Sequence, residues 1–212
     1  MQPVSWTLWL AFFVAAWAIS LSPGPGAVAV MGAALRHGVR RGYWMVPGLI
    51  LGFWTQLAVV AAGLGALLVT STLAFEIAKW TGVAYLVWLG IRQWRATEVP
   101  LTADPASRAP APSRRRLVAE GWALNAVNPK GTAFMLAVVP QFLVPTEPLL
   151  PQYLAIGATL AFTDLVVNAF FAAGAARLVG VLRTPRRMRL MNRVFGGLFI
   201  GFGLLLATLR RT

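Results

Sequence analysis

The 212-residue chain is 58% hydrophobic and only 12% charged, with a mean hydropathy of +0.69, which is typical of a membrane protein rather than a soluble domain. Its formal net charge of +13 would indicate a nucleic-acid partner in a soluble protein, but the arginines cluster between apolar stretches, so we expect no nucleic-acid binding. The chain has no cysteine and a lone histidine, His37, which excludes disulfides and thiolate metal sites, and we expect no metal and no other cofactor.

Six apolar stretches meet or nearly meet the length of about 20 residues that crossing a membrane requires. They cover roughly 6–35, 44–70, 73–94, 117–144, 151–176 and 190–209. No basic residue precedes the first stretch, so we predict a retained span rather than a cleavable signal peptide. The sequence therefore predicts an all-α membrane protein with six transmembrane helices, forming a single integral membrane domain over residues 1–212.

The charged residues between these stretches indicate the orientation of the chain. Residues 96–116 are rich in Pro, Ala, Ser and Arg and are predicted to be a flexible loop between repeat one, 1–95, and repeat two, 117–212. The connections after the first, third and fifth spans are rich in arginine, whereas those after the second and fourth have none. The positive-inside rule predicts that the basic connections are cytoplasmic and that both termini lie outside, although Arg210 and Arg211 count against this orientation.

The first span contains a helix-breaking cluster, Ser22-Pro23-Gly24-Pro25-Gly26. Proline removes a backbone donor and glycine permits turns, so the helix is predicted to stop and restart here. Broken helices at membrane depth are tolerated where protein or water satisfies their polar groups, which indicates a binding site or pathway. A simple kink or an interfacial turn is the alternative.

The fourth span contains a second cluster, Asn125 to Gly131, whose Pro129 lies 106 residues after Pro23. In the second spans of the two halves, Phe53-Trp54-Thr55-Gln56-Leu57 resembles Ala161-Phe162-Thr163-Asp164-Leu165. These matches predict two inverted three-helix repeats, with helices 1 and 4 broken at corresponding places.

Two charged residues within the predicted spans are candidates for a substrate site. Restarting helices at Gly26 and after Pro129 would direct free backbone amides toward an anion such as a carboxylate. Lys130 is predicted to add positive charge for anion binding, or else to form a structural ion pair that closes the helix break. Asp164 is a candidate proton carrier or partner of a substrate ammonium, or else the buried partner of Lys130.

Uncharged polar residues complete the predicted set. Asn125, Asn128 and Asn168 would hold a zwitterion or cap the broken helix. Gln56 and Thr55 would face the same cavity if the repeat is real, and otherwise would be hydrogen-bonding contacts between helices. We find no catalytic triad, phosphate loop or dinucleotide fingerprint, so we predict no catalytic residues.

The clusters Ser22-Pro23-Gly24-Pro25 and Asn128-Pro129-Lys130, together with the stretch 79–92, resemble the LysE/RhtB amino-acid exporters. The resemblance implies export of amino acids or close derivatives across the bacterial inner membrane, driven by the proton gradient, with a small-molecule substrate and a lipid bilayer as partners. A small-ion or metal-cation exporter and a non-transporting membrane scaffold are the alternatives. The spacing Gly197-x-x-x-Gly201 would allow helix contact in a homodimer, although internal packing explains it equally well.

Overall fold

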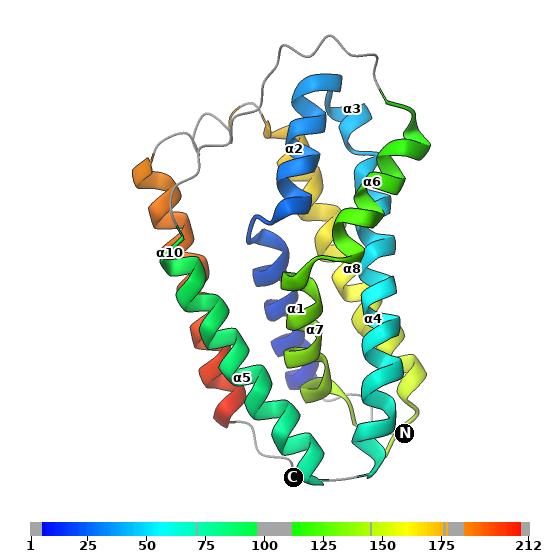
Figure 1. Cartoon of the computed structure of the whole chain (residues 1–212), viewed down its shortest axis with the longest axis vertical. Helices are drawn as coiled ribbons and strands as arrows, with labels where there is room; N and C mark the ends of the chain where they lie inside the picture. The colour runs from blue at the N-terminus through cyan, green and yellow to red at the C-terminus, as the bar shows by residue number, and fades with distance from the viewer. Residues whose placement is uncertain are drawn as a thin grey trace.

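The computed structural model describes residues 6–70, 72–96, 112–144, 146–175, 177 and 185–208. Helices form the framework of these ranges and no strand occurs within them, which confirms the all-α prediction there (Figure 1). The helices are α1 (Trp6–Leu21), α2 (Pro25–His37), α3 (Val39–Gly42), α4 (Met45–Thr70), α5 (Thr72–Trp94), α6 (Arg114–Ala126), α7 (Pro129–Val138), the 3₁₀ helix η1 (Val139–Phe142), α8 (Leu149–Ala173) and α10 (Pro185–Thr208).

Part of the predicted membrane topology is evident from helix length and composition. Among the described residues, Val39–Gly63 and Leu149–Ala173 are long and apolar enough to cross a membrane. The pair Trp9–Leu21 and Pro25–His37, bent by 52° at its break, is a third candidate. The full count of six spans stays a prediction.

The first helix break lies where the Pro and Gly cluster predicts it. Helix α1 ends at Leu21 and α2 begins at Pro25, with Gly24 as its N-cap in an extended conformation. Proline suits the first position of a helix because its missing N–H would have no partner there. The break therefore follows directly from the two prolines.

The second break lies between α6 and α7, at Val127 and Asn128, and again a proline begins the new helix. Helix α6 begins at Arg114, so the predicted loop 96–116 is wrong at its end. The Ser113 side chain accepts a hydrogen bond from the Arg116 amide at 3.2 Å, and this N-cap extends the helix into the arginine run. Residues 97–111 of that loop lie outside the described part of the chain.

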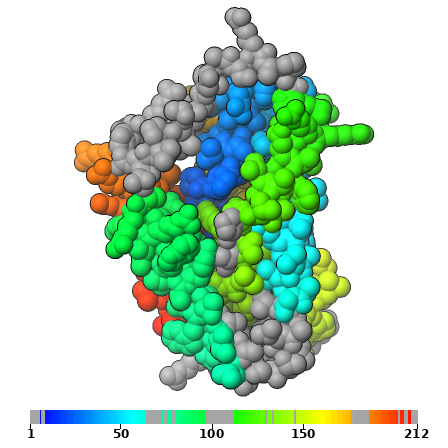
Figure 2. All heavy atoms as spheres, in the orientation of Figure 1, coloured from blue at the N-terminus to red at the C-terminus, as the bar shows by residue number. Residues whose placement is uncertain are grey.

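Small residues bring two pairs of helices into direct backbone contact. On α4, a Cβ added at Gly48 or Gly52 would collide with the backbone of α6, and one at Gly121 of α6 would collide with α4. On α5 and α10, Gly90 and Gly196 meet in the same way. Close approach through glycine is a common way for membrane helices to pack, and Figure 2 shows α4 and α6 side by side on the surface.

Helix directions and basic residues follow one pattern in Figure 1. The C-terminal end of α2, with α3, and the N-terminal ends of α6 and α10 lie toward the top of the view, and each carries arginines. Helix α1 begins and α10 ends toward the bottom. Within the described ranges these arginines thus share one end of the molecule, which we call the basic end.

Candidate functional site

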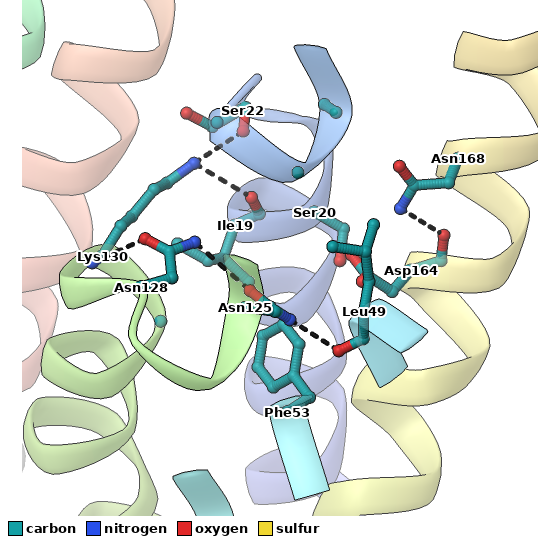
Figure 3. Close-up of a pocket in the computed structure, with 14 residues that line it drawn as sticks. Ile19, Ser20, Ser22, Leu49, Phe53, Asn125, Asn128, Lys130, Asp164 and Asn168 are labelled. Carbon is teal, nitrogen blue, oxygen red and sulfur yellow. Dashed lines mark hydrogen bonds between the residues drawn. The ribbon is translucent and has the colours of Figure 1, made fainter. Parts of the chain in front are cut away.

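A cavity of about 50 Å³ lies where the two helix breaks meet (Figure 3). Its walls come from α1 and the first break, α2, α4, the end of α6, the second break with α7, and α8. The lining residues are Ile19, Ser20, Ser22, Gly24, Gly26, Ala27, Leu49, Phe53, Asn125, Asn128, Lys130, Gly131, Asp164 and Asn168. Segments from both halves of the chain therefore build one polar site.

Lys130, in the first turn of α7, reaches across the cavity to the end of α1. Its Nζ donates to the Ser22 carbonyl oxygen at 2.6 Å and to the Ile19 carbonyl oxygen at 3.4 Å (Figure 3). The same ammonium lies 5.7 Å from the centre of the buried Phe199 ring on α10. A cation is favourable here because the last carbonyls of a helix carry partial negative charge.

The ammonium group of Lys130 is not fully used by these contacts. It has three N–H donors, and the two bonds to carbonyl oxygens leave one donor for another acceptor. No salt bridge within 4.0 Å joins Lys130 to Asp164, both of which the structure describes. The alternative of a direct ion pair between them is therefore not seen in this conformation, and Lys130 contacts the carbonyl oxygens at the α1 break instead.

Asp164 lies on the middle of α8 and faces the cavity. The Ser20 side chain of α1 lies beside its carboxyl group (Figure 3). The neighbouring Thr163 hydroxyl is 3.1 Å from the Ser20 hydroxyl, which ties α8 to α1. One turn further on, the Asn168 amide donates to the Asp164 carbonyl oxygen at 2.9 Å.

The asparagines of the second break hold the backbone of that break in place. The Asn128 side chain accepts from the Lys130 amide at 3.1 Å and thereby caps α7. Asn125, which is buried, donates to the Leu49 carbonyl oxygen of α4 at 2.7 Å. Asn128 is therefore a helix cap, as the alternative in the sequence analysis had it. Because of this cap, the amides of α7 are less available to an anion than the sequence predicted.

The first break differs from the second because α2 has no side-chain cap. Its first intrahelical bond runs from the Val28 amide to the Gly24 carbonyl oxygen, so the amides of Gly26 and Ala27 come before the hydrogen-bonded ladder. Both residues line the cavity. The α2 N-terminus is therefore the stronger of the two predicted anion sites.

Two lining side chains are buried with an unused polar atom. Ser22 Oγ and Asn168 Oδ1 have no hydrogen-bond partner, and these residues are 3% and 4% exposed. A buried polar atom without a partner costs free energy, so each unused atom favours a polar ligand or water in the cavity.

Gln56 lies beside the second break and does not line the cavity. Its Nε2 is 2.7 Å from the Asn125 carbonyl oxygen, 2.9 Å from that of Asn128 and 2.9 Å from Thr132 Oγ1. Thr55, next in the chain, is exposed on the outer face of α4 and accepts from Trp122 Nε1 at 3.1 Å. The prediction that both face the cavity is wrong, and Gln56 acts as a contact between helices.

Pro23 and Pro25 shape the first break without lining the cavity, and the side chain of Pro129 lies outside the described part of the structure. Sequence reasoning missed Ser20 and the apolar lining residues Ile19, Ala27, Leu49 and Phe53. Ser20 could have been found from its position one turn or less before the break, whereas the apolar residues carry no signal in so hydrophobic a chain.

The architecture defines a helical membrane protein with a polar cavity between two broken helices, and comparison with known proteins agrees. Residues 17–210 match the LysE type translocator family, so the chain belongs to that family. It is 41% identical over 202 residues to a homoserine/homoserine lactone efflux protein of Salmonella typhimurium, covering 95% of this chain and 97% of the relative.

Two further relatives widen this comparison. The chain is 40% identical over 201 residues to an uncharacterized membrane protein of Vibrio cholerae, covering 95% of this chain and 97% of the relative. It is 28% identical over 201 residues to a leucine efflux protein of an Enterobacter species, covering 93% of this chain and 94% of the relative. No solved structure matches the chain significantly.

Proposed function

We propose that the protein is a secondary transporter that exports an amino acid or a close derivative across the bacterial inner membrane, coupled to the proton gradient. The observation that carries this proposal is the cavity at which both helix breaks meet, with one lysine, one aspartate and three asparagines on its walls. The relatives named for efflux of homoserine, homoserine lactone and leucine support this substrate class.

The substrate carboxylate binds at the N-terminal end of α2. The uncapped amides of Gly26 and Ala27 line the cavity, and the positive end of a helix dipole favours an anion. The third N–H of Lys130 supplies a charged donor from the opposite break. Ser22 Oγ, buried without a partner, offers a further hydroxyl.

The substrate ammonium binds on the α8 side of the cavity. The Asp164 carboxyl group supplies negative charge and Asn168 Oδ1 supplies an unused acceptor. Asp164 also takes up the proton that drives export, because buried carboxyl groups within membrane segments are typical of proton relays. The cavity has room for on the order of four water molecules, which is comparable to a small zwitterion.

The proposal includes six spans arranged as two inverted repeats within one domain, 1–95 and 117–212 around the basic loop. Its support is that α4 and α8, and likewise α5 and α10, run in opposite directions, and that the two broken helices do the same (Figure 1). The basic end then lies in the cytoplasm, and the beginning of α1 and the end of α10 lie outside. Gly201, with nothing within 4 Å of an added Cβ, leaves a face of α10 for a homodimer.

Counterflow in proteoliposomes tests the proposal. The purified protein is expected to exchange at least one member of a panel of amino acids that includes homoserine and leucine. Lys130→Ala and Asp164→Asn are expected to lower exchange at least tenfold, whereas Glu120→Gln, a surface carboxyl that pairs with Arg116 at 2.9 Å, is expected to leave it unchanged. Absence of exchange for the whole panel contradicts transport, and normal exchange in both cavity variants contradicts the site.

The ion-exporter alternative has less support in the described residues. Among them no group of three or more His, Cys, Asp or Glu side chains is arranged to hold a metal ion, and the cavity wall carries a single carboxylate, Asp164. The alternative of a scaffold without transport activity predicts instead that replacing Lys130 and Asp164 has no functional consequence.

A further inference from the structure

A second, outward-facing groove of about 740 Å³ lies along the contact between α4 and α6. Three tryptophans line it, and Trp44 and Trp122 are 37% and 45% exposed. Helices α4 and α6 meet backbone to backbone through their glycines, so the large side chains on their outer faces flank the line of contact. In a membrane protein this face contacts lipid.

The end of the groove at the start of α6 is positively charged. Arg114 and Arg115 line it and are exposed, and no acidic side chain appears among its described lining residues. The next arginine, Arg116, is already paired with Glu120. The groove therefore presents two guanidinium groups to any anion at this end.

Arg114 is held in position by an aromatic ring. Its guanidinium carbon lies 5.0 Å from the centre of the Trp44 ring. A guanidinium that lies over an aromatic ring still has its N–H groups at its own edge, where they can donate to the oxygens of a phosphate. Tryptophan and arginine together are typical of the headgroup level of a membrane.

The remainder of the groove is apolar apart from the Thr55 hydroxyl and the tryptophan N–H groups. Trp122 Nε1 donates to Thr55 Oγ1, and the Thr55 hydroxyl donates to the Leu51 carbonyl oxygen at 2.9 Å. Trp122 lies eight residues after Arg114, about 12 Å along the helix. A ligand in the groove thus needs an anionic head and an apolar tail at least that long.

We propose that this groove binds one anionic phospholipid, with its phosphate on Arg114 and Arg115 and an acyl chain along Trp122 and Trp54. Basic pockets between membrane helices on the cytoplasmic side suit such headgroups. The site is separate from the cavity between the helix breaks and does not depend on the transported substrate.

Native mass spectrometry of the full chain with equal amounts of phosphatidylglycerol and phosphatidylcholine tests the proposal. The protein is expected to retain one phosphatidylglycerol in preference to phosphatidylcholine. Arg114→Gln/Arg115→Gln is expected to lower this preference roughly 25-fold, because each arginine near an anionic lipid contributes a factor of about five. The control Arg186→Gln/Arg187→Gln removes the same charge from exposed arginines at the start of α10, and should change the preference less than about twofold.

A second variant tests the apolar part of the groove and does not depend on the arginines. Ala119→Trp places a large ring on the exposed groove wall and is expected to abolish retention of the lipid. Equal retention of the two lipids, or equal losses in the two arginine variants, would overturn the proposal. A lipid-free dimer that dissociates in Ala119→Trp would show instead that a second copy occupies the groove.

Discussion

Replacing Gln56 by methionine isolates the role of the amide that supports the second helix break. The Gln56 Nε2 lies within hydrogen-bonding distance of two carbonyl oxygens and one hydroxyl of the α6–α7 connection. Methionine has a similar length and no donor, so the variant keeps the packing volume and leaves these acceptors without that partner.

The expected loss of stability follows from the number of protons that Nε2 can donate. An amide nitrogen has two, so at most two of the three contacts are full hydrogen bonds at one time. Each contributes about 0.6–1 kcal/mol, which gives about 1–2 kcal/mol in total. For a chain of this size that corresponds to a fall in unfolding temperature of about 2–8 °C.

Thermal unfolding in detergent, followed by tryptophan fluorescence, measures this difference. Val59→Met is the matched control, because Val59 lies on the same helix, is 66% exposed and receives the same new side chain without losing a hydrogen bond, so it should cost less than about 0.5 kcal/mol. An unfolding temperature for Gln56→Met within 1 °C of that of the unchanged protein would refute the reasoning. A stable variant that no longer binds substrate would return Gln56 to the binding site.

Three further predictions concern glycines and topology. Gly131→Ala is expected to lower the unfolding temperature by a few degrees, because its Cβ would lie 2.6 Å from Gln56 Oε1 and the Gln56 amide is held by its Nε2 contacts. Gly24→Ala would place its Cβ at an ordinary 3.8 Å from Lys130 and should change the unfolding temperature little, so similar falls in the two variants would contradict this packing. Gly196→Ala should destabilise the α5–α10 contact by about 1–3 kcal/mol, and Gly201→Ala, which meets nothing within 4 Å, should be neutral or stabilising under the same unfolding assay. Because the chain has no cysteine, a single Thr146→Cys should react with an impermeant maleimide from outside the cell and Ser113→Cys only after permeabilisation, and the reverse result would invert the proposed orientation.

Both helix breaks could be predicted from the sequence because their cause is local. Pro25 and Pro129 lack a backbone donor and each begins a new helix, so residue identity alone determines where α2 and α7 start. The start of α6 could not be placed as well, because an arginine run is typical of a loop and a single Ser113 cap was enough to make it helical.

The residues that line the cavity could be predicted only in part, because the sequence does not give the direction in which each side chain points. Thr55 and Gln56 are consecutive on one helix and therefore point about 100° apart, which here places Thr55 on the outer face and Gln56 against the second break. Lys130 and Asp164 both line the cavity, but which acceptor the Lys130 ammonium contacts depends on how far α7 lies from α1 and from α8. Those distances are set by helix packing, which no single residue determines.

The glycine contacts also give the two sides of the second helix break different neighbours. Helix α6 is held against α4 through Gly48 and Gly121, whereas α7 is held against α5, where a Cβ on Gly82 would lie 2.7 Å from the Ala137 Cα. The two residues between α6 and α7 therefore connect a helix packed on α4 to a helix packed on α5, and Gln56 of α4, which contacts both sides of the break, limits how far the two can separate. If α7 moves away from α1, the Lys130 ammonium leaves Ser22 and Ile19, and their carbonyl oxygens become free to accept another cation.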